Sequence, residues 1–260
     1  MKITIVGSGN VAGIFSGAIC KSTGLELSEI CARNSGQGKQ LAEAAGCNWV
    51  GEPERVSPAD VYLIAVKDSA LAEVSERLAV PDDSVVAHMA GGVSLDRLKS
   101  SSIHRGVMYP LQTFTAGHNT ELSSVPILVE GATDHARRTI MKLAESLSDR
   151  VLEIDSTQRA VIHAAGAIAC NFTNHLLHIS SQLLNEYGIP FSILGPLMTE
   201  TLRKAFAAPD PALVQTGPAV RHDTETINKH LTLLEDFSEE RFSEIYKLLS
   251  NSIWETSKKI

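Results

Sequence analysis

A glycine-containing turn near the start of the chain restricts its fold more than any other stretch. An apolar strand there runs into Gly7-x-Gly9-x-x-Ala12 and then directly into a helix. Gly7 permits the tight turn, Gly9 lets a pyrophosphate approach the backbone, and Ala12 still allows close packing of helix on strand. The free N–H groups and the positive end of the helix dipole then face a diphosphate. The residues expected to bind this diphosphate are Gly7, Gly9, Asn10, Val11 and Ala12.

The end of the second expected strand indicates which dinucleotide binds. An NAD site usually places Asp or Glu there, about 20 residues past the glycines, on the ribose 2′-hydroxyl. Here the strand over residues 25–32 is followed by Arg33, Asn34 and Ser35. Arg33 can hold a 2′-phosphate through two hydrogen bonds, and Ser35 can add a hydroxyl or cap the next helix. These residues predict NADP(H); the alternative is that Arg33 is a solvated charge and Glu29 binds the ribose.

Strands and helices alternate over the first part of the chain, and the alternation stops after Ile154. Residues 61–66 are apolar throughout, as expected of a parallel strand buried on both faces. The pattern predicts an α/β fold: a doubly wound Rossmann sheet with an extra βαβ unit at its edge in residues 1–154, and a second, all-helical dimerisation domain in residues 155–260. Further strands are expected at 84–87, 105–109, 125–129 and 151–154. Helices are expected at 11–22, 35–45, from the residue after Ser69 through Leu78, and at 134–147, 156–187, 191–207, 224–234 and 239–257.

Composition excludes several classes of function. The chain has 260 residues, 43% of them hydrophobic, which is enough for one Rossmann domain and a smaller partner. A net charge of −7 argues against a nucleic acid or an anionic membrane as partner. No run of 18 apolar residues occurs, and the first residues form a strand rather than a signal peptide, so a cytoplasmic location is expected. The four cysteines lack metal-ligand or redox spacing, and three of them sit in apolar positions, so buried free thiols are expected.

Several motifs carry a family resemblance. Ala65-Val66-Lys67 resembles a segment that borders the nicotinamide half of NADP in pyrroline-5-carboxylate reductases, and Met108-Tyr109-Pro110 resembles their Met-Pro turn. Longer motifs cover nearly the whole chain and resemble Rossmann-like oxidoreductases with a C-terminal domain of unknown function, within the superfamily of 6-phosphogluconate dehydrogenase, pyrroline-5-carboxylate reductase and ketopantoate reductase. This resemblance implies a helical second domain, a dimer and an NADP-type site, but no particular substrate. The longer motifs are YPLQTF at 109–114, HAAG at 163–166, NFTNHL at 171–176 and QTGPAVR at 215–221.

Three polar residues on the long expected helix are candidates for chemistry. The spacing of His163, Asn171 and Asn174 places them near one face of an α-helix. An imidazole exchanges a proton near neutral pH as a carbonyl becomes an alcohol or an imine an amine, while carboxamides fix the substrate. His163 and Asn171 are therefore predicted catalytic residues and Asn174 a substrate ligand. The alternative is that all three are satisfied core groups or dimer contacts.

The chain departs from its relatives at one position. Hydroxyisobutyrate-type relatives place a catalytic Lys four residues before the helix Asn, whereas this chain has Ala167 before Asn171 and Cys170 before Asn174. Neither side chain can replace that Lys. The proton donor must therefore be His163, a residue of the first domain, or water.

The remaining candidates follow strand ends or lie in the irregular loop at 209–223. The nicotinamide of a Rossmann cofactor lies past the carboxyl ends of the strands, near Lys67, Ala90 and Gln112. Gln112 and Lys67 are candidate catalytic residues; the alternatives are a loop cap for Gln112 and a solvated charge for Lys67. Thr216 and Arg221 are candidate substrate ligands, because a guanidinium matches a carboxylate, although Arg221 can instead pair with Asp223 or Glu225.

No metal site is expected. His175 and His178 lie three residues apart, but no Asp, Glu or Cys ligand accompanies them.

These features predict an NADP(H)-dependent oxidoreductase acting on a small, acidic carbonyl or imine metabolite. Two alternatives stay open: a non-catalytic NADP-binding regulatory protein and a deazaflavin-dependent NADP reductase. The helix expected at 156–187 is apolar on more than one face, so a homodimer through the helical domain is also expected.

Overall fold

The computed structural model describes residues 1–115, 120–235 and 240–260. The chain divides into two compact units, a sheet unit of residues 1–169 and a helical unit of residues 170–260. The domain boundary predicted from the sequence lies earlier, between residues 154 and 155. The first turns of the long helix count with the sheet unit because Arg159 and His163 contact residues of the sheet and its loops.

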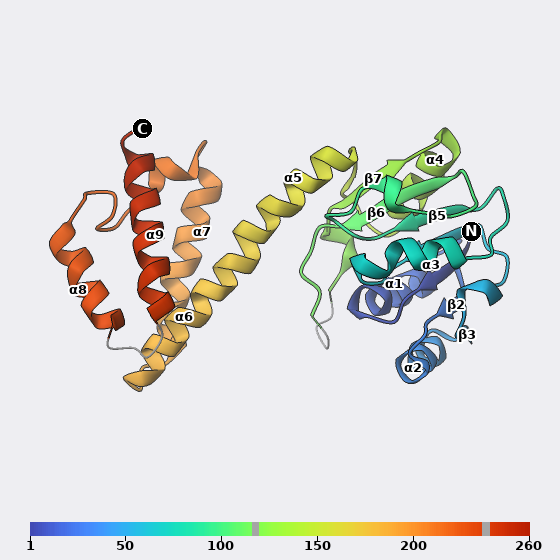
Figure 1. The fold of residues 1–260 in the computed structure, drawn as a ribbon, viewed down its shortest axis with the longest axis horizontal. Helices are drawn as coiled ribbons and strands as arrows, with labels where there is room; N and C mark the ends of the chain where they lie inside the picture. Colours follow the sequence, from blue (N-terminus) through green and yellow to red (C-terminus); the bar gives the residue numbers. More distant parts are fainter. Residues whose placement is uncertain (116–119, 236–239) are drawn as a thin grey trace. The chain divides into compact units, whose positions relative to one another are not determined.

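The sheet unit contains one sheet of eight strands in the order β3-β2-β1-β4-β5-β6-β7-β8. Figure 1 shows this sheet with helices beside it. The first six strands in this order are parallel, β7 is antiparallel to β6, and β8 is parallel to β7. This is the order of a doubly wound dinucleotide-binding sheet with a βαβ unit added at one edge, as predicted. The strands are β1 Lys2–Val6, β2 Glu26–Cys31, β3 Asn48–Val50, β4 Val61–Ile64, β5 Val85–His88, β6 Arg105–Pro110, β7 Ile127–Gly131 and β8 Val151–Glu153.

Two apolar cores cover the two faces of this sheet. The larger core joins alternate strand residues such as Ile5 and Leu63 to helices α1, α2 and α4. The smaller joins the intervening residues, among them Tyr62 and Ile64, to helix α3. The alternation follows from the two-residue period of a strand, which makes both faces of a parallel sheet apolar. The helices of this unit are α1 Asn10–Lys21, α2 Ser35–Ala45, α3 Leu71–Arg77, α4 Asp134–Glu145 and α5 Ser156–Gly166.

The helices α2 and α5 are each capped by the residue directly before their first serine, so the expected cap at Ser35 is wrong by one residue. Asn34, not Ser35, caps α2, because its side-chain oxygen accepts from the N–H groups of Gly36 and Gln37. Asp155, not Ser156, caps α5 in a capping box with Gln158. In both cases the preceding carboxamide or carboxylate captures the free N–H groups, which leaves the Ser35 and Ser156 hydroxyls available for other contacts.

The long helix expected at 156–187 is not uniform. α5 passes into a π-helical segment at Ala167–Phe172, and α6 continues at Thr173–Glu186. A π-helical turn bonds residues five apart, so it changes the rotation between the residues on either side of it. The argument that His163, Asn171 and Asn174 share one face needs an unbroken α-helical period and therefore loses its support. Such π segments occur frequently at functional sites.

The helical unit also contains α7 Gly195–Ala207, α8 Thr224–Glu235 and α9 Glu240–Ser257. Residue 239, the expected start of the last helix, lies outside the described residues. No side chain of α6 or α7 is buried. Within the described ranges, none of the helices has both the length and the apolar character needed to cross a bilayer.

The expectation of buried cysteines holds for only part of the set. Cys31 is buried, and burial raises the pKa of its thiol to about 12. Cys20 and Cys170 are exposed, because one lies on the outer face of α1 and the other in the helical unit, where few side chains are covered. All four thiols are free.

Candidate active site

The glycine turn between β1 and α1 has the geometry that a dinucleotide site requires. Gly7 has φ +133°, and a Cβ at this position would lie 2.2 Å from the carbonyl oxygen of Ala65. Its N–H donates to the Cys31 carbonyl over 2.8 Å. Only glycine therefore lets the turn pass between the ends of β2 and β4, next to the point where the strand order reverses.

The start of α1 is open to a ligand. Gly9 is the N-cap and contributes no side chain to the first turn, which contains no acidic residue. A Cβ built on Gly9 would meet nothing within 4 Å, so the backbone there lies against free space. Ala12 is fully buried against the sheet, whereas the Asn10 carboxamide donates to the Phe114 carbonyl over 3.1 Å. The first turn, including Asn10 and Val11, thus fits a diphosphate held by backbone N–H groups.

Burial bears on the alternative that Glu29, at the end of β2, binds the ribose. Glu29 lies on β2, and only 6% of the residue is exposed. Its carboxylate accepts hydrogen bonds from the N–H and the hydroxyl of Ser57 over 2.9 and 2.7 Å. It is therefore not available to a ribose. Arg33 is exposed between β2 and α2, and no ion pair involves it among the described residues. Asn34 and Ser35 are exposed beside it, with the Asn34 oxygen already engaged as helix cap.

The ends of β4 and β5 carry the residues expected near the nicotinamide. Ala65 and Val66 are half-buried, and the Ala65 N–H donates to the Val6 carbonyl over 2.7 Å. Lys67 is exposed and forms no ion pair in the described part of the chain. The half-buried Ala90 follows β5 and donates its N–H to His88 Nδ1 over 3.2 Å.

A tyrosine–histidine pair lies beside these strand ends. The Tyr109 hydroxyl at the end of β6 is hydrogen-bonded to His163 Nδ1 of α5 over 3.1 Å, and the tautomer decides which group donates. The rings meet edge to face with centroids 5.8 Å apart. A Cβ on Gly91 would lie 2.5 Å from His163 Nδ1 and 2.6 Å from Tyr109 Cζ, so glycine is required there. Burial, and secondarily the charge of Asp68, raises the pKa of Tyr109.

His163 is exposed rather than enclosed in a helical core. This geometry argues against the alternative that His163 is a satisfied core group. Tyr109 was not among the predicted site residues, although its motif was noted. The signal that could have found it is a polar ring directly before Pro110, where a strand of the sheet ends.

Gln112 follows β6 and is exposed. Its side-chain oxygen accepts from the N–H of Thr113 over 2.8 Å, as the loop-cap alternative predicts. The carboxamide nitrogen has no partner within the described ranges, so Gln112 still has a donor to offer a substrate.

The other predicted residues belong to the helical unit. Asn171 lies in the π-helical segment and Asn174 in the first turn of α6, both exposed. Thr216 lines an apolar cavity of about 560 Å³ within this unit. Arg221 is exposed and, in the part of the chain described, pairs with neither alternative partner: Asp223 accepts from Thr226, and Glu225 pairs with Lys229. The structure therefore brings His163 together with Tyr109 within the sheet unit. The other four predicted residues, Asn171, Asn174, Thr216 and Arg221, all belong to the helical unit.

Two family models match the sequence. Residues 2–91 match the family described as NADP oxidoreductase coenzyme F420-dependent, and residues 125–253 match a domain of unknown function, DUF2520. No curated protein matches the chain.

Solved structures resemble the chain over its whole length. The "putative NADP oxidoreductase BF3122" from Bacteroides fragilis shares 31% identity at a TM-score of 0.89, with 98% of each chain covered. A reductive aminase from Aspergillus terreus, solved with NADPH and ethyl-5-oxohexanoate, shares 11% identity at a TM-score of 0.75, covering 99% of this chain and 94% of the aminase. A 1-pyrroline-5-carboxylate reductase from Streptococcus pyogenes shares 14% identity at a TM-score of 0.62, covering 100% of this chain and 99% of the reductase. The last two likenesses show the fold alone.

The 31% identity to the Bacteroides fragilis protein, over 98% of both chains, shows a family relationship. The glycine turn, the strand order and the two matched domains point to the same family. This chain belongs to the family of NADP oxidoreductases in which a Rossmann domain is followed by a DUF2520 domain.

Proposed function

We propose that this protein is an NADP(H)-dependent reductase or dehydrogenase acting on a small, acidic carbonyl or imine. The observation that carries the proposal is the pair formed by the exposed His163 and the half-buried Tyr109 at the carboxyl ends of β5 and β6, in the same unit as the glycine turn. Ligands of doubly wound sheets bind at this edge.

The cofactor is proposed to bind through residues of the sheet unit. The open first turn of α1 takes the diphosphate, and Arg33 takes the 2′-phosphate with Asn34 and Ser35 beside it. Ala65, Val66, Lys67 and Ala90 border the nicotinamide end. When bound, the cofactor supplies or accepts the hydride, and the protein supplies orientation and the proton.

His163 is the proposed proton donor in the direction of reduction. An imidazole exchanges protons near neutral pH, and the Tyr109 hydroxyl fixes the orientation of the ring through Nδ1. The other ring nitrogen then remains available to the substrate oxygen or nitrogen. Lys67 and Arg221 are exposed cations without an ion pair among the described residues, and both suit an acidic substrate group. Gln112, Asn171, Asn174 and Thr216 are proposed as further substrate contacts.

The test follows NADPH oxidation with a panel of small oxo acids, cyclic imines and their neutral analogues. We expect turnover with acidic members, and we expect His163→Ala to lower it about 10²–10⁴-fold while NADPH affinity measured by calorimetry stays unchanged. His175→Ala, a histidine of the helical unit outside the proposed site, is the matched control. Tight NADPH binding without turnover across the panel would contradict the proposal and favour the regulatory alternative.

We further infer that the protein is a homodimer through its helical unit. Large apolar side chains of this unit are exposed in the single chain, including Phe172 at 61% and Leu197 at 63%. A second copy is the usual cover for such a surface, because most homo-oligomers are two-fold dimers.

A further inference from the structure

The first turns of α5 contain a buried cation. Arg159 is only 1% exposed, and it is the one buried residue of this helix. Removing a guanidinium from water is costly unless its hydrogen bonds and charge are matched. A helix whose one buried residue is an arginine therefore needs a local reason for burying it.

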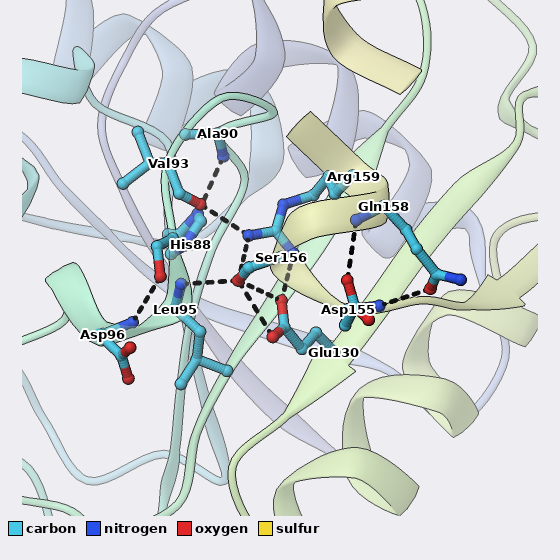
Figure 2. Close-up of polar contacts among 11 residues, drawn as sticks. His88, Ala90, Val93, Leu95, Asp96, Glu130, Asp155, Ser156, Gln158 and Arg159 are labelled. Atoms are coloured by element: carbon cyan, nitrogen blue, oxygen red, sulfur yellow. Dashed lines mark hydrogen bonds and ion pairs between the residues drawn. The ribbon is translucent and has the colours of Figure 1, made fainter. Parts of the chain in front are cut away.

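Arg159 joins three separate elements, as Figure 2 shows. Its Nη1 forms an ion pair with the Glu130 carboxylate on β7. Its Nη2 donates to the Val93 carbonyl over 2.6 Å and to the Ser156 hydroxyl over 3.0 Å. The guanidinium thus ties α5 both to a strand and to the loop that follows β5.

Ser156 closes the same network. Its hydroxyl lies 2.8 Å from the nearer Glu130 oxygen and accepts from the Leu95 N–H over 3.1 Å (Figure 2). The hydroxyl is free for these contacts because Asp155, not Ser156, caps α5. The loop after β5 is therefore held to the start of α5 at Val93 and at Leu95.

The same loop also meets His163. Gly91 and Gly92 lie against the His163 ring, and Gly91 lies against Tyr109 as well. His163 follows Arg159 by four residues, so it lies about one turn further along the same side of α5. One short segment, residues 91–95, consequently contacts both the buried arginine and the proposed proton donor.

His88 completes the surroundings of the guanidinium (Figure 2). It is fully buried at the end of β5, and burial together with the Arg159 charge lowers its pKa to about 4, while a Ser94 backbone contact opposes the shift. Its ring is therefore neutral at physiological pH. His88 adds no charge of its own beside Arg159, whose charge is matched by Glu130.

We propose that Arg159 is a positioning residue for His163: through Glu130, Ser156 and Val93 it fixes the start of α5 against the loop after β5, and this sets the contact between His163 and Tyr109. The proposal rests on the proposed function only in the role that it gives to His163. The network of Arg159 with Glu130, Ser156 and Val93, called the clamp below, lies entirely within the sheet unit.

The test measures the coupling between His163 and Tyr109 by NMR, without any substrate. The imidazole nitrogen chemical shifts of His163 are recorded with and without Tyr109→Phe, in the parent protein and in the Arg159→Lys and Ser156→Ala variants. We expect Tyr109→Phe to change the His163 shifts in the parent, and this change to fall by at least about half in both variants. Arg138→Lys is the matched control, because Arg138 also pairs with a carboxylate but on the exposed surface of α4.

Each outcome decides the proposal. An unchanged effect of Tyr109→Phe in the folded Arg159→Lys and Ser156→Ala proteins would overturn it, as would the absence of any effect in the parent. Ser156→Ala removes one hydroxyl and keeps both charges, so it carries the test if Arg159→Lys does not fold. Loss of coupling in a protein that never oxidises NADPH would support the clamp and contradict the proposed function. Once a substrate is known, Arg159→Lys is expected to lower turnover by about 10²-fold with NADPH affinity unchanged.

Discussion

The two units of this chain differ in how they bury apolar surface. In the sheet unit, every residue of β4 and β5 is buried, and helices complete a core on each face. In the described part of the helical unit, α6 and α7 contribute no buried residue, and the few buried side chains come from α8, α9 and the loop that precedes α8. Unfolding free energy in globular domains comes chiefly from such burial.

This difference separates two tasks. The sheet unit has a core on each face and holds the glycine turn, Arg33 and the His163–Tyr109 pair, so the chemistry proposed for it rests on elements that this core fixes. The helical unit presents large apolar side chains that its own described residues leave exposed. We infer that the sheet unit binds the cofactor and that the helical unit forms the contact between the two copies of a dimer.

The largest effect is expected from a charge placed on the uncovered surface. Phe172→Glu should raise the dissociation constant of the dimer by about 10²–10³-fold, because an unpaired charge would be buried between the copies. Sedimentation velocity over a concentration series measures this shift. Ile103→Glu is the matched control, since Ile103 is 67% exposed on the sheet unit and should leave the assembly unchanged. A parent protein that is monomeric at micromolar concentration would remove the distinction between the two units.

The same contrast explains what the sequence could predict. In the sheet unit, short stretches of sequence indicate the structure that they form. Continuous apolar runs indicate β4 and β5, and the glycine turn indicates the edge of the sheet where the cofactor binds. The fold class, the strand order around β1 and the βαβ unit at the edge were therefore predictable. The strand β3 was missed because three residues carry too little period to be distinguished from a loop. The π-helical segment was missed because nothing in an apolar helical sequence signals a change from i+4 to i+5 bonding.

The site was predictable in part, for a related reason. Arg33 could be proposed from its place after a strand, but only burial and the Ser57 contacts exclude Glu29 as its competitor. Tyr109 and His163 lie 54 residues apart, and their meeting depends on the Gly91 loop and on α5. Contacts of this kind are set by tertiary packing, which a single sequence does not reveal.

Acid should weaken the sheet unit through His88. Its pKa falls from 6.5 to about 4 on folding. Above pH 6.5 the ring is neutral in both states, whereas between pH 6.5 and about 4 the unfolded chain binds a proton that the folded chain excludes. The unfolding free energy contributed by His88 therefore declines as pH falls through this window, by about 3 kcal/mol at about 1.36 kcal/mol per pKa unit. Urea unfolding at pH 7 and pH 4.5 measures the decline, followed by the fluorescence of Trp49 in a Trp254→Phe background, because Trp254 belongs to the helical unit.

A neutral replacement isolates this contribution. His88→Asn keeps an acceptor for the Ala90 N–H and has no titratable group, so the loss of stability between pH 7 and pH 4.5 should shrink markedly, whatever the stability at pH 7. His135→Gln, at an exposed histidine of the same unit, should leave the pH dependence as it is. An identical decline in the His88→Asn protein would show that other groups are responsible for the acid sensitivity.

The smallest expected effect tests whether the sheet unit alone chooses the cofactor. Arg33 is exposed and forms no ion pair among the described residues, whereas Glu29 is buried and bonded to Ser57. At the end of β2, the Arg33 guanidinium is therefore the charged group that can reach a 2′-phosphate. Arg33→Ala should weaken NADPH binding by about 1.5–3 kcal/mol, the usual range for hydrogen bonds to a charged group, and should leave NADH binding nearly unchanged because NADH has no 2′-phosphate. Calorimetric titration of both cofactors gives the two affinities, with Arg138→Ala on α4 as the control for loss of a surface guanidinium. Equal affinity of the parent protein for NADPH and NADH would contradict the prediction, and a preference that survives in Arg33→Ala would assign the choice to another residue.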